Sequence, residues 1–143
     1  MHNDSLRFDI VDHVLLIVHA DVPPSDADWA RLIVVRNASR ERLRSHLVIA
    51  PPRAHINASQ RADVAGFMKE TAITIAVVTD SALVRGVARA IGLLGVPLRA
   101  FAPSELTKAL EFVIVPPSRH AEFVRRIELM KAQLAGNTRN ATL

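Results

Sequence analysis

The feature that most constrains the fold is a series of short apolar runs, each followed by residues typical of a helix start. These runs are HLVIA at 46–50, ITIAVV at 73–78 and a third one at 96–102. Strands that alternate with helices pair in parallel through right-handed crossovers. The sequence therefore predicts an α/β fold with a mostly parallel sheet.

The N-terminal part of the chain predicts a β-hairpin. Leu6–Val11 and Val14–His19 are apolar, β-branched stretches separated by Asp12-His13, a spacing that suits a tight turn. The second stretch is apolar at nearly every position, as expected of a strand covered on both faces. With this antiparallel start, we expect a mixed sheet of about five strands with helices packed on it.

Capping residues and apolar spacing predict the helices. Ser25 is expected to cap a helix that runs to about Arg44, with Trp29 anchoring it on the sheet. Gly95 is expected to follow a helix in a left-handed conformation. Further helices are predicted over 59–70, 82–94, from 103 onward and over 118–135. The helix over 82–94 has an expected apolar stripe of Leu83, Val84, Val87, Ala88, Ile91 and Leu94.

We expect one domain over residues 1–143. Its core is predicted over about 6–113, followed by an additional C-terminal helix over 118–135 and a flexible tail at 136–143. Phe123, Ile127, Met130 and Leu134 should form the buried stripe of that last helix.

Composition narrows the cellular and chemical setting. No apolar run approaches the roughly 20 residues of a membrane span, and the N-terminus lacks the pattern of a secretory signal. We therefore expect a soluble, cytoplasmic protein. The absence of cysteine excludes disulfides, thiolate nucleophiles and zinc–thiolate sites.

Two groups of polar residues follow predicted parallel strands, where sites commonly form in such sheets. Ser59, with Arg61 beside it, is a candidate phosphorylation or anion site; the alternative is that Ser59 only caps its helix. The second group is a candidate ligand or partner contact, with capping and a solvated charged face as the alternative. It consists of Asp80, Ser81, Arg85 and Arg89.

The densest positive charge lies near the end of the first predicted helix. Its residues are Arg36, Arg40, Arg42 and Arg44. Cations there complement the negative end of a helix dipole, and the alternative is a patch for an acidic partner or nucleic acid. The net charge of +4 is modest, and the chain has no tyrosine for stacking on bases. Nucleic-acid binding is therefore disfavoured.

No pattern in the sequence indicates catalysis. The histidines show no metal-ligand spacing, and there is no GxSxG, GxGxxG or P-loop motif. They are His2, His13, His19, His46, His55 and His120. We therefore expect no enzyme, no cofactor and no metal site.

The order of elements and the stretch AVVTDSALVRGVARAIGLLGVPLRAFAPSELTKALEFV, at 76–113, resemble the SpoIIAA-like or STAS-like family, including its bacterial STAS/SEC14-type branch. VVTDSALVRG and LRAFAPSELTKAL carry the resemblance, which spans about 6–113. It implies a non-catalytic module for protein–protein regulation, in some members controlled by serine phosphorylation at a helix start. Of the Asp-Ser-Ser-Gly pattern of the anti-sigma-factor antagonists, only Ser59 matches within Asn57-Ala58-Ser59-Gln60.

We therefore expect a regulatory or scaffolding module that binds a protein partner and associates with itself through an apolar helix face. Two alternatives stay open. One is a sensor that binds a small molecule or anion at the strand ends near Ser59 and Ser81. The other is nucleic-acid binding through the arginine run.

Overall fold

The computed structural model describes residues 4–142, with side chains described for 4–136. Its five strands lie side by side in chain order, and only the first pair is antiparallel. The strands are β1 (Leu6–Val11), β2 (Val14–His19), β3 (Ser45–Ile49), β4 (Thr74–Val78) and β5 (Leu98–Phe101). The predicted α/β fold with a mixed, mostly parallel sheet is confirmed.

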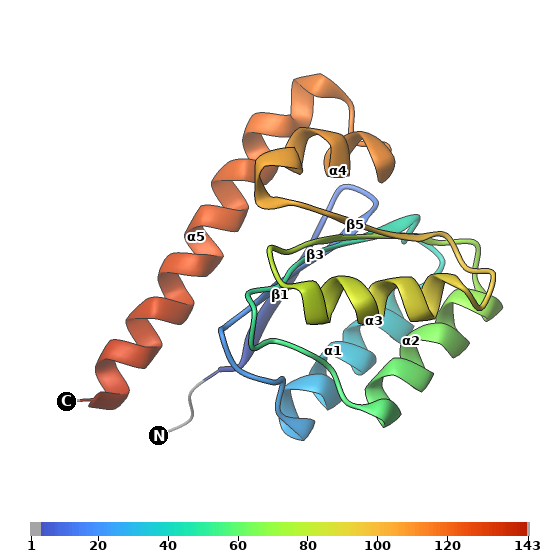
Figure 1. Ribbon diagram of the computed structural model, residues 1–143. Coiled ribbons are helices and arrows are strands. Elements are labelled where there is room, and N and C mark those ends of the chain that lie inside the picture. Colours follow the sequence, from blue (N-terminus) through green and yellow to red (C-terminus); the bar gives the residue numbers. More distant parts are fainter. Residues whose placement is uncertain (1–3, 143) are drawn as a thin grey trace.

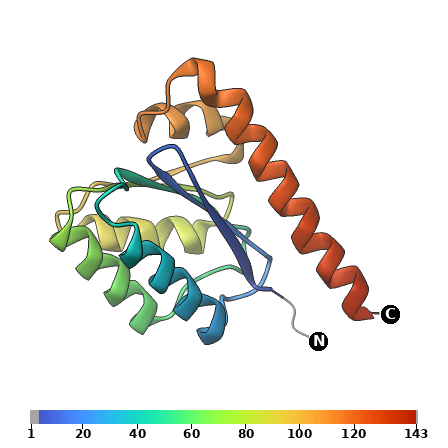
Figure 2. The ribbon, with the colours of Figure 1, turned by 180° about the vertical axis from the view of Figure 1, so that it is seen from behind.

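The helices cover the sheet on both faces (Figures 1 and 2). Strands joined in sheet order by right-handed crossovers place all their connecting helices on one face. Accordingly α1 (Asp26–Ala38), α2 (Ala58–Glu70) and α3 (Ala82–Gly92) share one face. On the other face lie the short 3₁₀ turn η1 (Pro103–Glu105), α4 (Leu106–Phe112) and the long α5 (Pro117–Thr142).

The sheet is buried from both sides. All six residues of β2 are buried, as the sequence predicts for a doubly covered strand. Val14, Leu16 and Val18 face the core beneath α4 and α5, whereas Leu15 and Ile17 face α1–α3. This alternation divides the apolar core into two layers.

The C-terminal helix belongs to the core of the molecule. Its predicted stripe of Phe123, Ile127, Met130 and Leu134 is buried in one cluster with β2, β3 and β4. The core thus extends beyond residue 113. The helix also continues to Thr142, through positions that the sequence analysis assigns to a flexible tail; residue 143 lies outside the described chain.

The first helix is correctly predicted at its start and too long at its end. Ser25 accepts a hydrogen bond from the backbone N–H of Asp28 (3.1 Å), and Trp29 is only 9% exposed, which confirms both the cap and the anchor. The helix ends at Ala38 instead of near Arg44. The following turn places Leu43 in the core and lets the backbone N–H of Arg44 donate to the carbonyl of His13 (2.9 Å).

The third helix is two residues shorter than predicted and has a narrower apolar stripe. Leu83 and Leu94 are exposed at 58% and 54%, although both were expected to be inward. Leu83 lies one residue, about 100°, from the inward Val84, and Leu94 lies beyond the last helical residue. Gly95 adopts a φ of 85°, as the sequence predicts.

Among the described residues, no helix has both the length and the apolar character needed to cross a bilayer.

Candidate ligand-binding site

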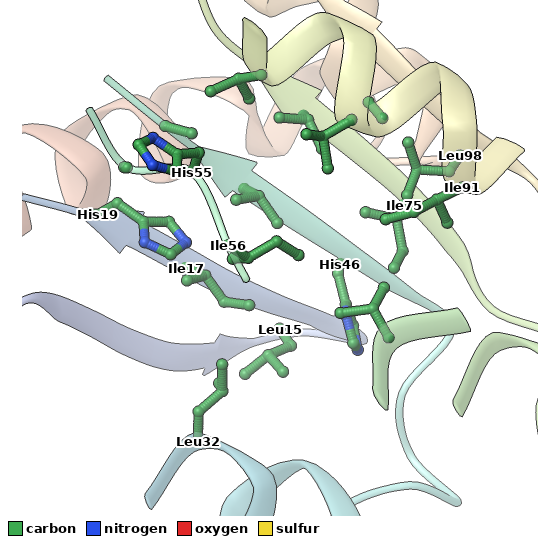
Figure 3. A pocket seen from close by; sticks show the side chains of 18 of the residues that line it. Leu15, Ile17, His19, Leu32, His46, His55, Ile56, Ile75, Ile91 and Leu98 are labelled. Carbon is green, nitrogen blue, oxygen red and sulfur yellow. The ribbon is translucent and has the colours of Figure 1, made fainter. Parts of the chain in front are cut away.

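A cavity of about 90 Å³ lies between the sheet and helices α1–α3 (Figure 3). Inward residues of β2, β3, β4 and β5 form its floor, and side chains from all three helices form its roof. The apolar walls include Leu15, Ile17, Leu32, Val48, Ile75 and Ile91. The volume is several times the 10–15 Å³ or so that one water molecule requires.

Three buried ring nitrogens of the cavity wall have no hydrogen-bond partner in the described structure. They are Nδ1 of His19, Nε1 of Trp29 and Nε2 of His46. Each unpaired buried polar atom costs roughly 1–3 kcal/mol, because water would have satisfied it in the unfolded chain. Buried indole N–H groups in particular usually find an acceptor. The cavity is therefore an apolar space with unused hydrogen-bonding capacity.

Strand register separates these nitrogens into two groups. His46 lies directly opposite Leu15 in the β2–β3 pairing, and His19 lies four residues further along β2. At 3.3 Å per residue, the two histidine positions are about 13 Å apart along the strands. Trp29 belongs to the first turn of α1, which enters from the carboxyl end of β2. His19 and Trp29 therefore lie at the carboxyl end of the cavity and His46 at the amino end.

At the amino end, the His46 ring packs among aromatic and charged groups. It stacks on Phe67, with ring centroids 5.7 Å apart. The guanidinium of Arg36 lies 4.1 Å from the centroid of the same Phe67 ring and forms two hydrogen bonds to Asp63, at 2.7 and 3.0 Å. The pKa of His46 is lowered to about 3, mainly by burial and also by the charge of Arg36, with the charge of Asp63 acting in the opposite direction.

At the carboxyl end, burial also keeps His19 uncharged. Burial lowers the pKa of His19 to about 4. Both imidazoles are therefore neutral near pH 7, and each carries one donor nitrogen and one acceptor nitrogen. His19 and His46 therefore offer hydrogen bonds to the cavity without adding a net charge.

The loop after β3 forms the outer wall at this end. His55 is exposed to solvent and also contributes to the cavity wall, near the end where Figure 3 shows His19. The loop is held by a hydrogen bond from the backbone N–H of Arg53 to Oδ1 of Asp21 (2.8 Å). The carboxyl edge of the sheet is thus where the cavity comes closest to solvent.

The predicted group at Ser59 does not enter the cavity. Asn57, not Ser59, caps α2: its Oδ1 accepts from the backbone N–H of Gln60 (2.8 Å), and Oε1 of Gln60 accepts from the N–H of Asn57 (3.0 Å). Ser59 is exposed in the first helical turn. Arg61 donates to the carbonyl of Ile56 (3.0 Å), and so supports the loop that walls the cavity.

The second predicted group lies on the outside of α3. Ser81 caps the helix by accepting from the N–H of Val84 (3.2 Å), in agreement with the capping alternative. Asp80, Arg85 and Arg89 are exposed. The opposite face of the helix supplies cavity residues, namely Val84, Val87, Ala88 and Ile91. The charged side chains are therefore separated from the cavity by the helix itself.

The four arginines do not form one basic patch. Arg36 is only 5% exposed and is paired with Asp63, whereas Arg40 lies 3.3 Å from Glu70 at the surface. Arg42 and Arg44 are exposed beyond the end of α1. Arg36 lies two helical turns after Trp29, so it belongs to the buried stripe of the helix and not to a surface patch.

His19 and His46 were missed as a pair because they are 27 positions apart in the sequence and match no motif. The available signal was the period of two along each strand. Leu15, Ile17 and His19 share one face of β2, and His46 joins that face through the pairing of β2 with β3. That pairing could not be read from the sequence.

Among the described residues, no three histidine or carboxylate side chains come together as a metal site. No protein-family model, curated protein or solved structure matches the chain.

Proposed function

We propose that this protein is a non-catalytic binding module that holds a small organic molecule between its sheet and helices α1–α3. The observation that carries the proposal is the set of three unpartnered ring nitrogens in an otherwise apolar cavity. A buried water needs two to four polar partners. Because the nitrogens are divided between two ends, water satisfies them poorly, whereas a molecule with an apolar body and a polar group fits the walls.

The cavity volume limits the size of this molecule. An apolar cavity of about 150 Å³ accommodates benzene. By proportion, the present cavity of about 90 Å³ suits a molecule of roughly four non-hydrogen atoms. A ligand much larger than this requires the helices to move outward.

The biological role that we propose is regulatory and cytoplasmic. The resemblance to STAS-like modules supports a protein partner, and the cavity supports a ligand that controls the partner's binding. The ligand would touch α1, α2 and α3 at once, because all three contribute to the wall. A change in occupancy then alters how these helices pack, and their outer faces are the surfaces open to a partner.

Filling the cavity tests the proposal. Ala88 is buried in the wall, and Ala90 is exposed on the same helix, so Ala88→Leu occupies the cavity while Ala90→Leu is its matched control. Trp29 is the only tryptophan and there is no tyrosine, so its fluorescence reports on the cavity directly. A panel of neutral molecules of about three to six non-hydrogen atoms is titrated against each protein.

We expect at least one compound to change the fluorescence saturably in the unmodified protein and in Ala90→Leu. Binding should be lost in Ala88→Leu. The absence of saturable binding in the unmodified protein, or equal binding by Ala88→Leu, would refute the proposal.

A further inference from the structure

We propose that the cavity selects an uncharged carbonyl compound, such as a short-chain amide, with its polar group at the His19–Trp29 end and its apolar body along the sheet. This inference rests on the proposed ligand-binding function and specifies the chemistry of the same site.

The requirement for an acceptor comes from Trp29. An indole Nε1–H can only donate a hydrogen bond. This N–H is buried and has no acceptor in the described structure, and Trp29 is one of the residues that line the cavity. A ligand that fits must therefore bring an oxygen or nitrogen lone pair to this end of the cavity.

His19 adds a second polar contact at the same end. Its Nδ1 is buried without a partner, and the neutral ring can donate or accept there, depending on its tautomer. A primary amide supplies a carbonyl for the indole and an N–H or carbonyl lone pair for the imidazole. An alkene of the same shape leaves both nitrogens unpaired.

The requirement for neutrality comes from the walls and from the missing counter-charge. A carboxylate or ammonium group loses its hydration among Leu15, Ile17 and Val48, and a buried ion needs a partner of opposite charge. The only cationic side chain of the wall is Arg36, whose guanidinium is already held by Asp63. It also lies toward the His46 end, away from the proposed polar contacts.

The experiment compares three compounds that have nearly the same shape. Propionamide is neutral and polar, propionate is its anionic counterpart, and 2-methyl-1-butene has neither charge nor hydrogen-bonding group. Each is titrated against the full chain at neutral pH, and the readout is the NMR signal of the single indole N–H, because Trp29 is the only tryptophan.

We expect propionamide to shift this signal saturably, with a Kd at least about tenfold lower than the Kd of either other compound. The preference should depend on His19. His19→Phe keeps an aromatic ring but removes the nitrogens, and should weaken propionamide about tenfold while leaving 2-methyl-1-butene unchanged. His120→Phe, outside the cavity wall, is the matched control and should bind as the unmodified protein does.

The outcomes separate this inference from the proposed function. If 2-methyl-1-butene or propionate binds as tightly as propionamide, the selectivity is refuted although the cavity still takes up a ligand. If none of the three binds, and the neutral panel does not bind either, the cavity holds water only and both proposals fail. The affinities of the three compounds for the unmodified protein test the selectivity even if His19→Phe does not fold.

Discussion

Two histidines at opposite ends of the cavity are kept neutral by the protein around them. His19 and His46 are both buried, and their pKa values fall to about 4 and about 3 from an ordinary value of 6.5. For His46, burial has the largest effect, and the charges of Arg36 and Asp63 act in opposite directions. Because the unfolded chain takes up these protons more readily than the folded protein, acid should favour unfolding.

We predict that the free energy of unfolding falls as the pH is lowered from 7 to about 5. The loss begins near the unfolded pKa of 6.5, and the folded protein is still unprotonated at both histidines at that lower pH. Each histidine contributes roughly 2 kcal/mol over this interval, at 1.36 kcal/mol per pH unit. Urea denaturation at the two pH values measures the difference.

A variant identifies the source of this loss. His46→Phe retains the stacking on Phe67 and should remove about half of the pH dependence. A stability that does not change between pH 7 and 5 would contradict the burial of neutral imidazoles.

At the scale of elements, helix starts are well determined by the sequence, but the residue that caps a helix is not always the nearest serine. In α2, Asn57 and Gln60 form reciprocal hydrogen bonds, and Ser59 is exposed. We predict that Asn57→Ala lowers the stability by about 1 kcal/mol, because backbone N–H groups lose their acceptor. Ser59→Ala is the matched control.

Thermal denaturation of both variants checks this prediction. Ser59→Ala should change the stability by less than about 0.5 kcal/mol. A larger loss for Ser59→Ala than for Asn57→Ala would show that serine, and not asparagine, caps the helix.

Helices α1 and α2 are joined by the ion pair between Arg36 and Asp63. Arg36 is buried while Asp63 keeps about a quarter of its side chain exposed. We predict that Arg36→Met costs roughly 2–4 kcal/mol, somewhat below the value for breaking a fully buried pair, because solvent still reaches the remaining carboxylate. Arg40→Met, which removes a surface pair with Glu70, should cost at most about 1 kcal/mol.

A double-mutant cycle with Asp63→Asn separates the ion pair from the packing of the Arg36 guanidinium on Phe67. Additive losses for the two single variants would mean that the ion pair does not couple the helices.

The ends of elements show where sequence reasoning stops. The hairpin is predicted to the residue because its two strands and turn are set by neighbouring positions. The end of α1 is not predicted correctly. Residues 39–44 contain good helix formers, so the sequence alone favours a longer helix. Tertiary contacts decide it: Leu43 is buried in the core, and the N–H of Arg44 donates to the carbonyl of His13.

At the scale of the whole molecule, the strand order explains why a cavity forms on one face. With all five strands in chain order, α1, α2 and α3 share a face, and large side chains such as Trp29 and Phe67 line the cavity that remains beneath them. On the opposite face, α4 and α5 pack against the sheet through a continuous apolar cluster.

The fold class could be predicted from the sequence, but the cavity could not. The alternation of strands and helices is a local pattern, whereas a cavity depends on how far large side chains hold two layers apart. The general location of the cavity could be predicted in part. The sequence indicates the carboxyl ends of the strands, and the loop with His55 reaches the cavity there, although the predicted Ser59, Asp80, Arg85 and Arg89 point elsewhere.

The central claim is that the space between the sheet and α1–α3 holds a ligand whose polar group meets His19 and Trp29. A crystal structure of the protein grown with propionamide tests it most directly. We expect electron density for one amide in this cavity, with a polar atom within about 3 Å of Nε1 of Trp29 and another contact to Nδ1 of His19. A cavity that contains only ordered water, or that is closed by the surrounding side chains, would contradict the claim.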